Sequence, residues 1–165
     1  MQIEVYLGLG SNIGVKDLYL KQAIAAIEKL DQTKINNISS TYITKAWGNT
    51  EQAEFHNLVI KIKTSLEAPE LLKKLQEIEM NMGRRFTEKW GPRIIDIDIL
   101  LYGDKIIHTE ELRVPHQYLK ERLFVLVPLY EINKDLIFPD DGTHIQEVLI
   151  TVLDREGEEN IIKRL

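Results

Sequence analysis

Two aspartates separated by one residue, Asp96 and Asp98, are the best candidates in this chain for holding a divalent cation. They lie in an apolar run, 94–102, that we expect to form a β-strand. Alternate residues of a strand share a face, so the two carboxylates point the same way, about 7 Å apart. Mg²⁺ is commonly held by one or two carboxylates together with substrate phosphates. Such a pair is often only a solvated strand face, but this strand is apolar on both faces, which favours a metal site.

The ten residues directly before this strand, Arg84 to Arg93, form a basic loop with four cations, Trp90 and a Gly-Pro pair. Arginine forks suit polyphosphate oxygens, and a tryptophan ring packs well on a flat ring. A solvated loop is the simpler interpretation for any single cation. Cations beside a carboxylate pair nevertheless favour a metal-bound polyphosphate as the shared ligand.

Other motifs in the chain carry weaker signals. The glycines of the stretch Gly8 to Gly14 are spaced G-x-G-x-x-x-G, which fits neither a dinucleotide-binding loop nor a P-loop, so we expect a tight turn bordering the site. None of the four histidines has metal-cluster spacing. His116, six residues before Arg122, is the one that we expect to join a phosphate-binding group.

Composition narrows the class of protein. The chain has 165 residues, which predicts one domain over 1–165, and its net charge of −5 argues against nucleic acid as the main partner. It has no cysteine, which excludes a disulfide, a thiolate zinc site and a cysteine nucleophile. No apolar run reaches the length of a membrane span, and the first residues lack the basic start of a signal peptide, so we expect a cytoplasmic protein without a membrane partner.

Hydrophobic periodicity predicts the order β-α-β-β-α-β over the first hundred residues. This order predicts an α+β fold, a ferredoxin-like sandwich with helices on one face of an antiparallel sheet and the other face open for a site, followed by additional C-terminal helices. On the last strand we expect Ile99 and Leu101 to point into the core, and Leu100 and Tyr102 to share the face of the aspartates. The predicted strands are 3–9, 35–44, 55–64 and 94–102, and the predicted helices are 17–30 (capped by Asp17), 69–82, 117–122 and 144–152.

The residues alone thus predict a Mg²⁺-dependent enzyme acting on a nucleotide polyphosphate. Beyond this, the chain resembles the 6-hydroxymethyl-7,8-dihydropterin pyrophosphokinases of folate biosynthesis, from Tyr6 to about Pro139. The most specific piece is Trp90-Gly91-Pro92-Arg93-Ile94-Ile95-Asp96-Ile97-Asp98. The others, in the expected order, are Gly8-Leu9-Gly10-Ser11-Asn12, Phe55-His56-Asn57, Pro69-Glu70-Leu71-Leu72, Gln76-Glu77-Ile78-Glu79, Gly83-Arg84, Val114-Pro115-His116 and Arg122-Leu123-Phe124.

The resemblance implies transfer of a pyrophosphoryl group from ATP, the co-substrate, to the pterin hydroxymethyl oxygen, with release of AMP. It implies that Asp96 and Asp98 hold two Mg²⁺ ions and that Arg84 and Arg93 are catalytic cations. The implied ATP contacts are Gln76, Glu79, Trp90, Arg93, Ile99, His116 and Arg122. The implied pterin contacts are Thr44, Ala46, Phe55, Asn57, Asp96 and Phe124, with the two phenylalanines sandwiching the ring. Glu111 stands where some members have a basic ATP contact, and Arg113 is the nearest substitute.

Two other functions remain open from the sequence alone. We expect the protein to be a monomer. A nucleotidyl transferase or cyclase on the same sandwich would also use paired aspartates, but it would release pyrophosphate rather than AMP. An RNA-binding sandwich would stack bases on Phe55 and Tyr6. The acidic net charge and the carboxylate pair argue against RNA, because carboxylates repel phosphate.

Overall fold

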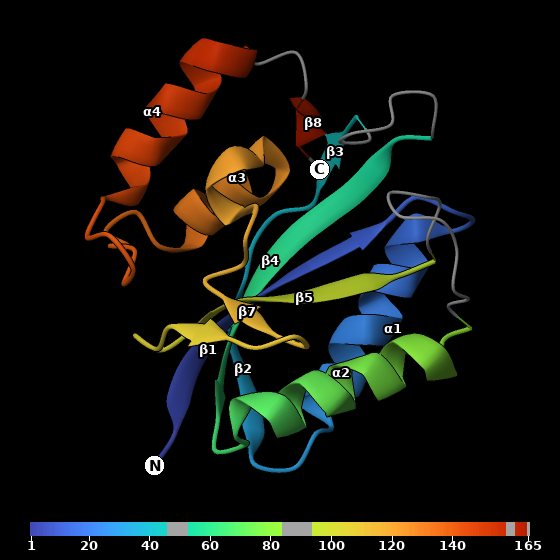
Figure 1. Cartoon of the computed structure of the whole chain (residues 1–165). Coiled ribbons are helices and arrows are strands. Elements are labelled where there is room, and N and C mark those ends of the chain that lie inside the picture. Colours follow the sequence, from blue (N-terminus) through green and yellow to red (C-terminus); the bar gives the residue numbers. More distant parts are fainter. Residues whose placement is uncertain (46–52, 84–93, 158–160, 165) are drawn as a thin grey trace.

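The centre of the computed structural model, which describes residues 1–45, 53–83, 94–157 and 161–164, is a six-stranded antiparallel sheet (Figure 1). Its elements, in chain order, are β1 Ile3–Ser11, α1 Lys16–Glu28, β2 Thr33–Ile38, β3 Tyr42–Thr44, β4 Phe55–Thr64, α2 Ala68–Asn81, β5 Asp96–Tyr102, β6 Ile107–His108, β7 Arg113–Val114, the 3₁₀ turn η1 Leu119–Glu121, α3 Leu123–Ile132, α4 Ile145–Glu156 and β8 Ile161–Arg164. The sheet order is β5-β1-β4-β3-β8, and β2 also pairs with β4. This arrangement confirms the predicted α+β class.

One core fills the space between the sheet and helices α1 and α2. The strands supply it with alternate residues, as the sequence pattern predicts for β4. Pro69 stands in the first turn of α2, where the missing N–H of a proline costs nothing, and the helix ends before Gly83. The buried strand residues on this face are Val5, Leu7 and Leu9 of β1, Leu58, Ile60 and Ile62 of β4, and Ile97 and Ile99 of β5.

Strand β1 extends further than predicted. Gly10 and Ser11, expected only in a tight turn, continue the predicted strand 3–9, which pairs with β4 as far as Ser11 opposite His56. Because Gly8 and Gly10 are two apart on a strand, both lie on the face that α1 and α2 do not cover. The turn prediction was therefore wrong for these residues, and the two glycines share the face of the aspartates instead.

Strand β5 keeps the predicted faces for Asp96 and Asp98 but not for its last two residues. A register shift against β1 between Tyr6 and Leu7 leaves Leu100 as an extra residue, and the alternation reverses after it. Leu101 therefore packs on the face of the aspartates, and Tyr102 turns under the helices, where its hydroxyl donates to the Leu66 carbonyl at 2.6 Å. Both residues were predicted on the opposite faces.

The predicted strand 35–44 is two strands, β2 and β3, separated at Ser39 and Ser40. The Ser39 hydroxyl accepts a hydrogen bond from the Val59 N–H at 2.9 Å, so a side chain replaces the backbone in the ladder. Ser40 turns away, and its N–H donates to the Glu131 carboxylate at 3.1 Å. Serine side chains that bond the backbone locally interrupt a strand that β-branched residues would otherwise continue.

Helix α1 is not capped by Asp17 as predicted. It begins at Lys16, and its N-cap residue, Val15, makes no side-chain capping bond. Asp17 therefore lies inside the first turn, where its carboxylate meets His56 Nδ1 at 2.7 Å. This contact ties the start of α1 to the start of β4, where His56 lies between Ser11 of β1 and Ile43 of β3.

A second layer, α3 and α4, covers part of the face that was expected to stay open (Figure 1). Helix α3 is apolar on all sides and packs on Tyr6, Val59 and Leu101. Its end is fixed by Glu131, which accepts from the Ser40 hydroxyl at 2.8 Å and the Tyr42 hydroxyl at 2.6 Å. The uncovered part of this face lies beside the aspartates.

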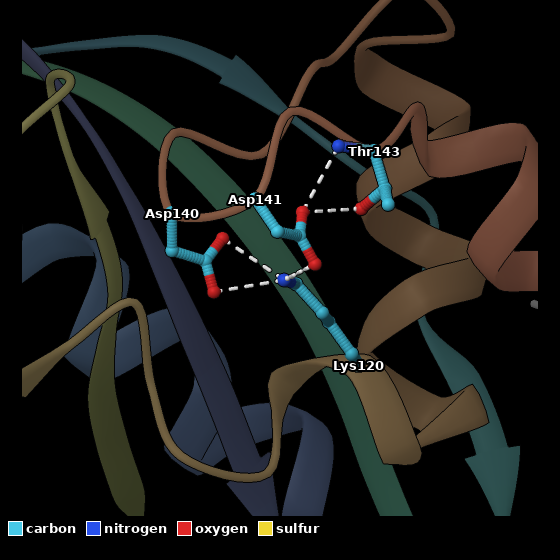
Figure 2. A network of polar contacts seen from close by, with 4 residues as sticks. All are labelled: Lys120, Asp140, Asp141 and Thr143. Carbon is cyan, nitrogen blue, oxygen red and sulfur yellow. Dashed lines mark hydrogen bonds and ion pairs between the residues drawn. The ribbon is translucent and has the colours of Figure 1, made fainter.

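A cluster of charges fastens the segment before α3 to the loop before α4 (Figure 2). Lys120 donates to Asp140 at 2.8 Å and to Asp141 at 2.7 Å, and Asp141 accepts from the Thr143 backbone and hydroxyl. The hydrogen bonds from Lys120 and Thr143 lower the pKa of Asp141 to about 2. We call these four residues the Lys120 clamp. It holds η1, and hence the chain between His116 and α3, in place.

The last strand, β8, is a feature that the sequence did not predict. It pairs antiparallel with β3, so that Ile43 lies opposite Lys163. The tail of the chain thus extends the sheet beside β3.

No helix within the described ranges is long and apolar enough to cross a bilayer.

Candidate active site

Asp96 and Asp98 lie where two hollows meet, and each aspartate lines both. The first hollow, here the aromatic hollow, has walls of ring, amide and glycine backbone; its residues include Gly8, Gly10, Thr44, Phe55, Asn57, Leu100, Arg122 and Phe124. The second, here the acidic hollow, is rich in carboxylates; its residues include Leu72, Gln76, Glu79, Ile99, Glu110, Glu111, Arg113 and His116. Two ligands, one in each hollow, would therefore meet at the aspartates.

The aspartates are placed by the pairing of β5 with β1. Asp96 lies opposite Gly10 and Asp98 opposite Gly8, so glycines leave the space in front of both carboxylates open. Both side chains are half-buried. Two oxygen donors on one face of a paired strand fit a hard cation such as Mg²⁺, which needs only one or two carboxylates from the protein when phosphates supply other ligands. The donor set here thus fits the metal that the sequence predicted.

The polar wall of the aromatic hollow is Asn57 with Thr44. Both are buried, and the Asn57 amide nitrogen donates to the Thr44 hydroxyl at 2.7 Å. This bond orients the amide, with its oxygen above Gly10. A Cβ at Gly10 would lie 2.5 Å from that oxygen, closer than real Cβ atoms come. Glycine at this position is therefore what lets Asn57 reach across β1.

The aromatic wall comes from two distant parts of the chain. Phe55 begins β4, and Phe124 lies in the first turn of α3; both are half-buried, and both line the hollow. Arg122, which is buried, holds its guanidinium 5.4 Å from the centre of the Phe124 ring and 4.9 Å from that of Tyr118. Stacking of this kind fixes the plane of the guanidinium. Arg122 lines the aromatic hollow, whereas the resemblance implied that it contacts ATP.

Four of the implied ATP contacts line the acidic hollow: Gln76, Glu79, Ile99 and His116. Gln76 is exposed on α2, and Ile99 is buried in β5. Glu79 is also buried, and one of its carboxylate oxygens accepts a hydrogen bond from the Ile97 backbone N–H at 2.8 Å. Glu111 and Arg113, which the resemblance compares with a basic ATP contact, also line this hollow.

His116 joins the acidic hollow as a neutral donor. The Tyr118 backbone N–H donates to Nδ1 at 3.2 Å, so a neutral ring carries its proton on Nε2, and Nε2 lies 3.9 Å from the nearer oxygen of Asp98. Burial is the main cause that lowers the pKa of His116 to about 4; the positive charge of Arg122 also lowers it, and Asp96 opposes the shift. At neutral pH the ring is therefore uncharged, with an N–H beside the aspartates.

Comparison with known protein families identifies the family to which this chain belongs. Residues 6–134 match the family model described as 7,8-dihydro-6-hydroxymethylpterin-pyrophosphokinase (HPPK). The chain belongs to the HPPK family. The match spans both hollows and the aspartates between them, and it confirms the family that the sequence motifs indicated.

Relatives of known name agree. The chain is 50% identical over 136 residues to the 2-amino-4-hydroxy-6-hydroxymethyldihydropteridine pyrophosphokinase of Aquifex aeolicus (82% of this chain, 83% of the relative). It is 47% identical over 127 residues to the Bacillus subtilis protein of that name (77% and 76%). Among solved structures, an HPPK-DHPS protein of Plasmodium falciparum with pterin and p-hydroxybenzoate matches with a TM-score of 0.77 at 17% identity, over 98% of this chain and 46% of that one. The chain thus spans about half the length of that HPPK-DHPS chain.

The structure brings together most of the site residues implied by the HPPK resemblance. Four of them, Ala46, Arg84, Trp90 and Arg93, lie outside the described residues, as does the rest of the basic loop. The expectation that Gly8 and Gly10 border the site is confirmed, but they do so from a strand and not from a turn, because their spacing was compared only with phosphate-binding loops. The same spacing read with a period of two would have placed both on the face of Asp96 and Asp98.

The RNA-binding alternative loses one of its two stacking residues. Tyr6 is 6% exposed, lies under the second helical layer, and its hydroxyl accepts from the Asn133 amide at 2.9 Å. A base cannot stack on a ring that is covered in this way. Phe55 remains accessible, but in the aromatic hollow beside Asn57.

Proposed function

We propose that the aromatic hollow binds the pterin, that the acidic hollow binds ATP, and that the reacting atoms meet at Asp96 and Asp98. The chain is a pyrophosphokinase: it transfers the terminal pyrophosphoryl group of ATP to 6-hydroxymethyl-7,8-dihydropterin. The single observation that supports this placement is that both aspartates line both hollows. A two-substrate transfer needs such a shared boundary, because the two reacting atoms must come within about 3.5 Å.

The pterin ring lies between Phe55 and Phe124 in this proposal. Flat aromatic ligands pack well between two rings, and the glycine backbone of β1 below them takes up little space. The Asn57 amide oxygen and the Thr44 hydroxyl read the polar edge of the ring, with Ala46 contributing backbone. The hydroxymethyl group then extends toward Asp96.

The triphosphate lies in the acidic hollow against Gln76 and His116, whose Nε2–H donates to a phosphate oxygen. The other ATP contacts implied by the resemblance are Glu79, Trp90, Arg93, Ile99 and Arg122. Asp96 and Asp98 hold Mg²⁺, two ions by the resemblance. When bound there, Mg²⁺ neutralises phosphate charge and polarises the phosphorus under attack.

The transfer itself is a displacement at the β-phosphorus of ATP. The pterin hydroxymethyl oxygen forms a bond to the β-phosphorus, the bond from that phosphorus to the oxygen bridging it to the α-phosphorus breaks, and AMP leaves with that oxygen. The hydroxyl proton is released. Arg84 and Arg93 stabilise the negative charge that develops on the transferred group and on AMP.

We further propose that residues 1–165 act as one domain and as a monomer in the cytoplasm. Both hollows are formed from one chain, so a second copy is not needed to complete either of them. Light scattering at the protein concentration of the assay tests the monomer: a mass near 19.2 kDa supports it and a doubled mass contradicts it.

The nucleotide product tests the proposed function. The protein is incubated with ATP, Mg²⁺ and 6-hydroxymethyl-7,8-dihydropterin, with Asp96→Ala and the control Asp104→Asn beside it. Asp104 is an exposed acid in the turn that follows β5, outside both hollows. We expect AMP and a diphosphorylated pterin in equal amounts, lost in Asp96→Ala and kept in Asp104→Asn. ADP would mean ordinary phosphoryl transfer, and released pyrophosphate would mean the nucleotidyl transferase alternative.

A further inference from the structure

Strand β5 is the edge of the sheet, and one peptide on its outer side is bound by a buried acid. β1 pairs with only one side of β5, with Gly10 opposite Asp96 and Gly8 opposite Asp98. The N–H of Ile97, between the two aspartates, donates instead to the Glu79 carboxylate at 2.8 Å. Glu79 comes from α2, which packs beside β5 (Figure 1).

Packing alone does not explain a carboxylate at this place, because burying its charge costs folding free energy. Glu79 is 6% exposed and stands on α2 among Leu75 and Ile78, which belong to the apolar core. Burying a charge disfavours folding unless hydrogen bonds compensate. A bond from a backbone N–H to a carboxylate is among the stronger ones, and it pairs the Ile97 N–H on the outer side of β5, where the Leu100 carbonyl in turn accepts from the His116 N–H at 3.0 Å. The bond therefore fixes the peptide that joins the two aspartates.

We propose that Glu79 is a positioning residue: by holding the Ile97 N–H, it fixes the Asp96 and Asp98 carboxylates relative to each other and so sets their affinity for Mg²⁺. The inference rests on the proposed function in assigning the metal to the two aspartates. It differs from the role implied by the resemblance, which makes Glu79 a direct ATP contact. Groups that orient metal ligands typically affect metal affinity or activity by about 10- to 100-fold.

Two substitutions separate the reach of Glu79 from its charge. Glu79→Gln keeps the length and an acceptor oxygen but removes the charge. Glu79→Asp keeps the charge but is shorter by one methylene, which withdraws the carboxylate by about 1.5 Å from the Ile97 N–H. Glu77→Gln is the matched control, since Glu77 is an exposed acid on the same helix whose nearest cation is Lys74 at 4.0 Å.

The first readout is hydrogen exchange of the Ile97 amide in the protein without metal or nucleotide. We expect exchange to accelerate by about tenfold in Glu79→Asp, the equivalent of one hydrogen bond, and to stay near wild type in Glu79→Gln and Glu77→Gln. Unchanged exchange of Ile97 in Glu79→Asp would overturn the inference. Thermal unfolding of each variant establishes that it is folded before exchange is measured.

The second readout is the affinity for a non-hydrolysable ATP analogue, measured with Mg²⁺ and with a chelator. A positioning role predicts that Glu79→Asp loses about tenfold or more in affinity with Mg²⁺ and little without it, while Glu79→Gln stays close to wild type. Equal losses with and without metal would make Glu79 a direct nucleotide contact and overturn the inference. These readouts do not depend on the pterin reaction, so a wild-type protein that forms no AMP refutes the proposed function without deciding the role of Glu79.

Discussion

The two hollows that share Asp96 and Asp98 have opposite linings, so in the proposed function they would recognise their ligands by opposite means. The aromatic hollow presents rings, an oriented amide and glycine backbone, which suit a flat ligand, and Lys45 and Arg122 also line it. Among the described residues that line the acidic hollow, one is an arginine, Arg113, and five carry carboxylates: Glu79, Asp96, Asp98, Glu110 and Glu111. A triphosphate placed there meets repulsion unless cations accompany it. In the proposed function, the described residues of the sheet and of α3 thus supply most of the groups that would bind the pterin, whereas the nucleotide side would depend on Mg²⁺ and on the cations of the basic loop.

The largest effect expected from this contrast is at Asp98. Asp98→Asn keeps the shape of the side chain but removes a charged metal ligand, and the loss of several kcal/mol of charge stabilisation corresponds to about a thousandfold fall in turnover. We expect the affinity for Mg²⁺–ATP to fall as well and the affinity for the pterin to stay within about threefold, because one hydrogen bond or less is changed on that side. Calorimetry with each substrate alone measures both affinities.

The matched control is Asp104→Asn, in the turn after β5. It should leave turnover and both affinities unchanged. If Asp98→Asn weakens pterin binding as much as nucleotide binding, the two hollows are not distinct in the way described, and the contrast fails.

A smaller effect, confined to the other side, is expected at Gly10. In Gly10→Ala the new methyl group would lie 2.5 Å from the Asn57 amide oxygen, so the amide must move and its bond to Thr44 is strained. Loss of one well-oriented hydrogen bond to the pterin corresponds to about tenfold in affinity. The affinity for Mg²⁺–ATP should not change. Fluorescence titration with the pterin measures the loss.

A double-mutant cycle with Asn57→Ala shows whether the methyl group acts through the amide. Once Asn57 is truncated, Gly10→Ala should have little further effect on pterin affinity. Additive losses would mean that the methyl group obstructs the pterin itself and that the amide is not the mediator.

The smallest effect is expected outside both hollows, at the Lys120 clamp. Lys120→Met removes a partly exposed ion pair, which should cost about 1 kcal/mol or less in unfolding free energy. The hydrogen bonds to Asp141 lower its folded-state pKa from 3.8 to about 2, so their stabilisation is present above about pH 4 and is lost as the pH falls through 2. Thermal melts from pH 5 to pH 2 should therefore fall less steeply in the variant. Parallel curves for the variant and the wild type would contradict this.

The sequence predicted much of the fold and the centre of the site, for identifiable reasons. The period of two in β4 and in the first part of β5 placed Ile60 and Ile62 in the core and Asp96 and Asp98 on the opposite face, because a strand has only two faces. The motifs of the HPPK family then predicted the residues around them. Local pattern was sufficient wherever a residue's environment is decided by its near neighbours.

The wrong predictions concern residues whose position is decided by contacts with distant parts of the chain. Nothing near Leu100 signals the register shift that exchanges the faces of Leu101 and Tyr102, since it depends on the pairing with β1. The break at Ser40 depends on Glu131, about ninety residues later. Helix α3 is apolar all round, which predicts burial but not the face of the sheet on which it packs.

The carboxylate of Glu131 also implies an order of assembly. Strand β3 is three residues long and carries Thr44, and two groups beside that residue, the Ser40 hydroxyl and the Tyr42 hydroxyl, are held by Glu131 at the end of α3. Contacts between residues far apart in the sequence form late, because a long stretch of chain must first be ordered. A nascent chain that emerges only as far as β5 can pair its central strands and present both aspartates. It lacks Glu131, which holds β3 and hence the polar wall formed by Thr44 and Asn57. In the proposed function, competence to bind the pterin therefore arises only after the second helical layer has been synthesised.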